Sequence, residues 1–146
     1  MNSLEVLLCA IAILIAAVFL AGCSSEEAVT VPRASAEQVT VLDSAQGKAL
    51  IDAEKKVVVI DARPRGEYMS GHLVGAQSID VTDAAAWNFR TSGLDPDLPT
   101  VLYCSAAPCS QQAAEKLLAL GFTQVYDLGG IWDWNPKDLS VEKPEG

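Results

Sequence analysis

From Val39 onward, the hydrophobic and polar positions form two alternating kinds of segment. Short β-branched runs are typical of strands covered on both faces, and apolar residues spaced three and four apart are typical of amphipathic helices. The pattern predicts strands at Val39–Leu42, Val57–Asp61, Ala76–Ile79, Val101–Tyr103 and Gln124–Leu128. It predicts helices at Ser44–Asp52, Asp83–Phe89 and Ser110–Leu120, and a loop at Thr91–Pro99. This alternation predicts a single α/β domain with a layered fold.

Cys104 lies where the strand ending at Tyr103 gives way, through a short loop, to a helix. Open α/β sheets form binding sites at the carboxyl ends of their strands, and a helix amino terminus favours a thiolate. At the other end of this helix, Gly121 is the expected stop, and Phe122 is expected to contact Leu117. Cys104 is therefore the candidate nucleophile, and the alternative is an inert packing cysteine.

Two motifs in the order expected of one family surround these segments. The first follows the pattern D-x-R-x-x-x-E-[YF]-x-x-G-H-I-x-G-A, with a leucine at the isoleucine position: Asp61, Arg63, Glu67, Tyr68, Gly71, His72, Leu73, Gly75 and Ala76. The second is a strand ending in cysteine, then a helix, G-[FY]-x-x-V and G-G-[IL]-x-x-W: Cys104, Gly121, Phe122, Val125, Gly129, Gly130, Ile131 and Trp134. Over Val39 to Trp134 the chain resembles the rhodanese family of sulfurtransferases.

The resemblance implies a rhodanese-like three-layer fold, with a mostly parallel sheet of about five strands and helices on both faces. It also implies that Cys104 accepts a sulfane sulfur as a persulfide and passes it to a thiol or cyanide. No cofactor is implied, because the backbone amides of a loop can hold a sulfur anion without a metal. The implied active-site loop is formed by Ser105, Ala106, Ala107, Cys109 and Ser110.

This loop departs from the family pattern at two positions. Ala107 stands where glycine is common, and Cys109 stands where arginine or another polar residue is frequent. Alanine resists a positive φ, and Pro108 lacks an N–H that would point at the sulfur, although proline suits the first turn of a helix. We therefore expect the loop amides from Ser105 to Ser110, except Pro108, to form a weaker anion site than usual.

Cys109 has two interpretations. It is either the resolving or redox partner of Cys104, which requires Cα atoms within about 7 Å, or a small packing residue. The first interpretation leaves open a thiol-disulfide redox protein as an alternative to sulfurtransfer, and a non-catalytic rhodanese-like binding module is a third possibility. No metal site is expected, because two thiols and a single histidine leave a zinc shell incomplete.

We expect several residues of the motifs to have structural roles. We expect Asp61 to pair with Arg63, and the segment containing Glu67 and His72 to tie a loop to the sheet. The same applies to two aromatic residues near the end of the domain, which we expect to pack in the core or at its rim: Trp132 and Trp134.

The amino terminus predicts where the domain works. Residues 6–21 are almost continuously apolar, and the following Gly22 and Cys23 complete a segment that resembles a bacterial lipobox. We expect residues 1–22 to be a lipoprotein signal peptide, Cys23 to be lipidated, residues 23–37 to be a flexible tether and residues 38–146 to be the domain. Residues 1–22 lack the basic residues usual in a signal peptide, which leaves a transmembrane anchor as the alternative.

These features predict a protein of the bacterial cell envelope, anchored to a membrane by lipid and facing the periplasm or the exterior. In that compartment disulfides persist. Cys104 and Cys109 are the only thiols expected in the mature chain, because Cys9 leaves with the signal peptide and Cys23 is lipidated. The formal net charge of −9 argues against nucleic-acid binding. The expected partners are a small sulfur donor and a thiol or cyanide acceptor, and a monomer is expected.

Overall fold

The computed structural model describes residues 29–32 and 38–144. The predicted signal peptide and Cys23 lie outside the described residues, so lipid anchoring and the envelope location stay predictions. Within the described part of the chain, no helix is long and apolar enough to span a membrane. Part of the predicted tether contacts the domain, since the Thr30 carbonyl accepts a hydrogen bond of 3.1 Å from the Gln46 side chain.

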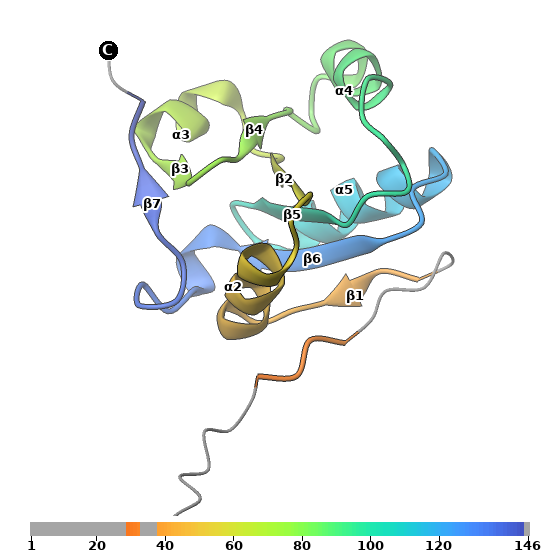
Figure 1. The fold of residues 1–146 in the computed structure, drawn as a ribbon. Helices are drawn as coiled ribbons and strands as arrows, with labels where there is room; N and C mark the ends of the chain where they lie inside the picture. Colours follow the sequence, from red (N-terminus) through yellow and green to blue (C-terminus); the bar gives the residue numbers. More distant parts are fainter. Residues whose placement is uncertain (1–28, 33–37, 145–146) are drawn as a thin grey trace, which may run out of the picture.

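The described residues form alternating strands and helices (Figure 1). The strands are β1 (Thr40–Val41), β2 (Val58–Asp61), β3 (His72–Leu73), β4 (Gln77–Ser78), β5 (Thr100–Cys104), β6 (Val125–Gly130) and β7 (Val141–Glu142). The helices are α2 (Ser44–Ala53), α3 (Arg65–Ser70), α4 (Ala84–Thr91), α5 (Ala107–Ala119) and the 3₁₀ helix η1 (Ile131–Asp133).

Five strands form a parallel sheet in the order β1-β6-β5-β2-β4. The predicted five-stranded parallel sheet is thereby confirmed. β5 lies at its centre, pairing with β2 on one side and β6 on the other, so its carboxyl end lies between two neighbouring strands. Loops that follow such a central strand open at the edge of the sheet where α/β proteins place their sites.

Helices cover both faces of the sheet, as predicted, and two apolar clusters separate the layers (Figure 1). One cluster joins Ile60 and Leu102 to Trp87 of α4 and Leu117 of α5. The other joins the opposite side chains of the same strands to α2 and to the chain after β6, and it contains Tyr103. Strand periodicity explains the division, because successive side chains point to opposite faces.

Helix ends follow the local sequence. The carboxylate of Asp43 accepts a hydrogen bond from the Gln46 amide and the Gln46 side chain accepts one from the Asp43 amide, so both residues cap the start of α2. α5 ends at Ala119, and Gly121 follows with φ +89°. Phe122 then donates its N–H to the Leu117 carbonyl at 3.2 Å. The predicted glycine stop and the return of Phe122 toward Leu117 are both confirmed.

Some boundaries and elements differ from prediction. The sequence pattern missed α3, β3 and β7, since each is short and β3 and β7 pair with each other across about 70 residues. α4 includes Thr91, which was predicted to begin a loop. α5 begins at Ala107 and not at Ser110, because proline fits the first helical turn and so Pro108 does not end the helix. This earlier start shortens the predicted active-site loop, because Ala107, Cys109 and Ser110 belong to α5.

Candidate functional site

Cys104 is the last residue of β5, as predicted. Its side chain belongs to the apolar cluster under α4 and α5, and the residue is only 1% exposed. It forms a disulfide with Cys109, the third residue of α5, with their Cα atoms 5.8 Å apart. Of the two interpretations of Cys109, the disulfide favours the first, in which Cys109 is the partner of Cys104. Ala106, Ala107 and Pro108, which lie between the two cysteines, are exposed.

The backbone of the loop offers fewer free amides than expected. The N–H groups of Cys109 and Ser110 both donate to the Ala106 carbonyl, at 3.1 and 3.2 Å. These two amides therefore serve the first turn of α5, and the expectation that they point at the sulfur is wrong for this disulfide form. Ala107 needs no positive φ, because it already belongs to α5, and no non-glycine residue in the described ranges has one. The departure from glycine at this position is thus free of backbone strain.

Ser105, the residue after Cys104, connects the loop to a charge network. Its hydroxyl donates to Glu67 Oε2 at 2.7 Å, and this oxygen lies 3.9 Å from Arg63 Nη1. Arg63 Nη2 in turn donates to Asp61 Oδ2 and to the Gly71 carbonyl, each at 2.6 Å. The predicted pairing of Asp61 with Arg63 is confirmed. The contact between Glu67 and the loop was not predicted, because it joins residues 38 positions apart.

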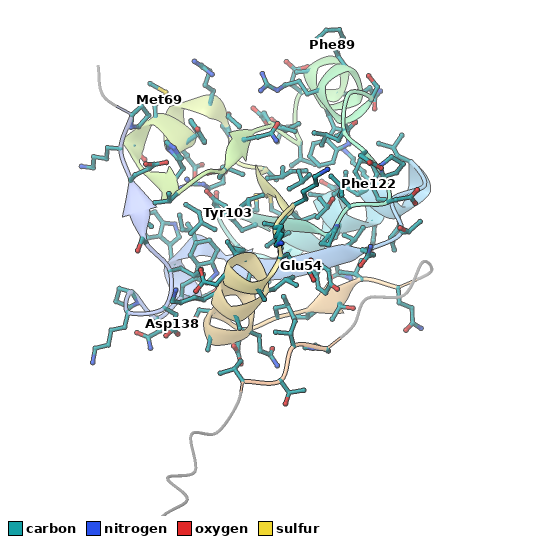
Figure 2. All side chains as sticks on the ribbon, viewed as in Figure 1. Glu54, Met69, Phe89, Tyr103, Phe122 and Asp138 are labelled. Carbon is teal, nitrogen blue, oxygen red and sulfur yellow. A yellow bond between two sulfur atoms is a disulfide. The ribbon has the colours of Figure 1, made fainter. Side chains whose placement is uncertain are left out.

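Tyr103 completes this network at the core of the sheet, where Figure 2 shows it inside the fold. Its hydroxyl donates to Asp61 Oδ2 at 2.7 Å and accepts from the Leu73 amide at 2.9 Å. Burial, together with the negative charge of Asp61, raises the pKa of Tyr103 far above its ordinary value. For Arg63, burial alone would lower the pKa, but the hydrogen bond and charge of Asp61 outweigh it and raise the pKa.

We expect Tyr103 to make stability fall in alkaline solution. Its folded pKa lies above its unfolded value of 10.0, so the native state keeps the proton that the unfolded chain loses. The contribution of Tyr103 to stability is complete below about pH 10. Above that pH the free energy of unfolding falls by up to about 1.4 kcal/mol per pH unit. Urea unfolding from pH 8 to 11 tests this. Tyr103→Phe should start about 1–3 kcal/mol less stable, because Asp61 and the Leu73 amide lose a partner, and it should show a flatter alkaline slope. Equal slopes would contradict the assignment.

His72 has the contacts of a structural residue. Its ring stacks on Tyr68 with a centroid distance of 3.7 Å, and Nδ1 lies 3.0 Å from the Tyr68 carbonyl. Nε2 lies 3.5 Å from Glu142 Oε1 of β7. These contacts tie the short strand β3 to its neighbours, in line with the structural role predicted for this segment.

Gly130, the last residue of β6, lies against the backbone of the loop between Cys104 and α5. A Cβ atom at this position would lie 3.0 Å from both the Ala106 Cα and the Ser105 carbonyl oxygen, and 2.9 Å from Asp133 Oδ2. Only glycine allows the end of β6 to approach the loop backbone this closely. The paired glycines of the second motif indicated a close backbone contact. They did not indicate that the contact would be with Ser105 and Ala106.

The two tryptophans after β6 differ. Trp134 packs its ring edge-on against Tyr103 at 4.8 Å and donates its indole N–H to the Leu128 carbonyl, as expected of a packing residue. Trp132 is 77% exposed, so the expectation that it packs in the core or at its rim is wrong. It belongs to η1, which starts directly after Gly130.

Fixed cations and metal ligands are scarce around the described site. Arg63 is 1% exposed, donates to Asp61 and the Gly71 carbonyl and lies beside Glu67, so it is not available to an anionic donor. Arg65 and Arg90 are exposed. Among residues 29–32 and 38–144, no group of three or more acidic, histidine or cysteine side chains is arranged to hold a metal ion.

Comparison with known families identifies this arrangement. The family model described as "Rhodanese-like domain" matches residues 43–137. The chain belongs to the rhodanese-like domain family.

Curated relatives of this rhodanese-like chain include proteins named thiosulfate sulfurtransferase GlpE. The one from Pseudomonas fluorescens (strain SBW25) is 36% identical over 91 residues, which cover 60% of this chain and 81% of the relative. The one from Pseudomonas putida (strain GB-1) is 32% identical over 93 residues, which cover 64% of this chain and 82% of the relative.

Solved structures agree with the family and the fold. The Alr3790 protein from Anabaena sp. is 25% identical with a TM-score of 0.62, covering 70% of this chain and 91% of that structure. A structure described as rhodanese with anions, from E. coli, is 28% identical with a TM-score of 0.52, covering 61% of this chain and 100% of that structure.

Proposed function

We propose that this chain is a sulfurtransferase in which Cys104 carries sulfane sulfur as a persulfide. The observation that carries the proposal is the position of Cys104, at the end of the central strand β5 and beside the first turn of α5. The family supports it, since relatives that the chain resembles over most of their length are named thiosulfate sulfurtransferases.

The disulfide must be reduced before this chemistry begins, because a thiolate is the reacting form of cysteine. The Cys104 thiolate then attacks the outer sulfur of thiosulfate. A new sulfur–sulfur bond forms on Cys104, the sulfur–sulfur bond of thiosulfate breaks, and sulfite leaves with the electron pair. An acceptor thiolate or cyanide next attacks the outer sulfur of the persulfide, takes it and regenerates the Cys104 thiolate.

The chain supplies two aids to the anionic sulfur. The amino end of α5, a helix of 13 residues, places its positive dipole end next to Cys104. The loop is held in place by the Ser105–Glu67 hydrogen bond and by Gly130, so little reorganisation accompanies the reaction.

Sulfite release tests the proposal. The full chain is reduced with a dithiol, desalted without oxygen and mixed with thiosulfate. We expect about one equivalent of sulfite per chain, none from Cys104→Ser and none from the unreduced disulfide form, whose Cys104 sulfur is bonded. Sulfite release that is absent from the reduced chain, or equal in Cys104→Ser, would refute the proposal.

The disulfide itself favours a second candidate function, thiol-disulfide exchange through Cys104 and Cys109 without any sulfane sulfur. The same experiment separates the two candidates. A redox protein would reduce a small disulfide such as oxidised glutathione while releasing no sulfite from thiosulfate. No contact in the described residues favours the third alternative, a binding module without catalysis.

A further inference from the structure

The disulfide between Cys104 and Cys109 lies inside the proposed site and joins the proposed nucleophile to a second sulfur five residues away. Cys104 is buried, whereas Cys109, on the first turn of α5, is half-buried and packs against the core cluster that contains Cys104. Cys109 is therefore the more exposed residue of the pair. Reduction leaves the Cys109 thiol within bonding reach of the Cys104 sulfur, because the two Cα atoms are 5.8 Å apart.

We propose that Cys109 is the internal thiol that discharges the Cys104 persulfide and releases its outer sulfur as hydrosulfide. This inference rests on the proposed function, because it needs a persulfide on Cys104. It assigns the chain a distinct net reaction, the reductive cleavage of thiosulfate to sulfite and hydrosulfide. It also gives the disulfide a role as the product of each turnover.

The steps balance as follows. Transfer from thiosulfate leaves a persulfide on Cys104 and releases sulfite, and the persulfide takes up a proton. The Cys109 thiol loses its proton, and its thiolate attacks the Cys104 Sγ. The bond between the two cysteine sulfurs forms, the bond from Cys104 Sγ to the outer sulfur breaks, and hydrosulfide leaves with the electron pair. The sulfane sulfur gains the two electrons that the two thiols lose. A dithiol reductant then supplies two electrons and two protons to restore both thiols.

The geometry favours attack on the inner sulfur over transfer to an external acceptor. The Cα separation of 5.8 Å is within the range that a disulfide requires, and the bond present in the structure shows that the two side chains can meet. An internal thiol on so short a loop acts at millimolar or higher effective concentration. Hydrosulfide is also a good leaving group, since a leaving thiol of lower pKa departs faster.

The supports of the loop keep the two sulfurs together after reduction. The contact of Gly130 with Ser105 and Ala106 fixes the loop from one side, and the Ser105–Glu67 hydrogen bond fixes it from another. The helical hydrogen bonds from Cys109 and Ser110 to the Ala106 carbonyl hold the first turn of α5. None of these contacts involves the two sulfur atoms, so we expect the reduced loop to keep them.

The test follows the fate of the sulfur in a single turnover. The full chain, reduced and desalted without oxygen, is mixed with thiosulfate while sulfite, hydrosulfide and intact mass are measured. Wild type is expected to release about equal amounts of sulfite and hydrosulfide, and to end two hydrogens lighter than the reduced chain. Cys109→Ser is expected to gain the mass of one sulfur atom, and its rate of hydrosulfide release should fall by roughly 100-fold.

Two further variants keep the test decisive. Cys109→Ala replaces Cys109→Ser if the serine variant does not fold, and it should accumulate the same persulfide. Gln111→Ser, an exposed change on the same helix, should behave like wild type. Equal hydrosulfide release from wild type and Cys109→Ser, or a persulfide that persists in wild type, would overturn the role of Cys109 while leaving sulfurtransfer standing. Absence of sulfite from every variant would remove the proposed function, and this inference with it.

Discussion

Arg63→Met should lower the free energy of unfolding by about 3–5 kcal/mol, the cost typical of breaking a buried ion pair from one side. Arg63 is 1% exposed and Asp61 is fully buried, so no water replaces the lost guanidinium. After the change, the Asp61 carboxylate keeps two donors, the Tyr103 hydroxyl and the backbone N–H of residue 63. The Gly71 carbonyl loses the side-chain donor that lay 2.6 Å away. Urea unfolding at neutral pH, with the disulfide intact in both proteins, measures the difference.

Arg65→Met is the matched control, because it removes the same charge from an exposed position two residues away. Its effect should stay within about 0.5 kcal/mol. A loss below about 1 kcal/mol for Arg63→Met would show that the network contributes little to stability, as exposed ion pairs do. A double variant in which Asp61 is also made neutral should recover part of the loss, because the isolated buried charge is then gone.

Gly130→Ala should slow sulfite release from thiosulfate by roughly 100-fold, the penalty typical of a displaced reacting group. The new Cβ would meet the backbone of Ser105 and Ala106 at 3.0 Å, so the loop next to the proposed nucleophile Cys104 has to shift. The Asp133 carboxylate at 2.9 Å can rotate away, whereas the backbone cannot. Rates of sulfite release from the reduced chain, compared at equal folded fraction, test this expectation.

Gly66→Ala provides the control for Gly130→Ala. Gly66 lies in α3, and a Cβ there would have no neighbour within 4 Å. The change should leave sulfite release unaltered and stabilise the helix slightly, since alanine is a better helix former than glycine. If Gly130→Ala reacts at the wild-type rate, the loop tolerates the displacement, and the close approach of β6 serves packing alone.

Much of the fold could be predicted from local pattern. The β-branched run before Asp61 predicted a strand covered on both faces, because such strands are continuously apolar. Gly121 predicted the end of α5, because the left-handed turn after a helix favours glycine. The motifs around Arg63 and Cys104 predicted the family. The short elements α3, β3 and β7 escaped prediction. β3 and β7 pair with each other across about 70 residues, a contact that local pattern does not encode.

By itself the sequence determined the order of the elements, the place of Cys104 at the end of a strand and the presence of a second cysteine five residues later, because all three are encoded by neighbouring residues. Only the tertiary structure decided that the two sulfurs are bonded and that two amides expected to serve the sulfur are engaged by Ala106. It also decided that Glu67 and Gly130 hold the loop. Some of these contacts join segments that are distant in the chain, and others depend on the residue at which α5 starts. The spacing of residues along the sequence specifies neither the distant contacts nor the start of the helix.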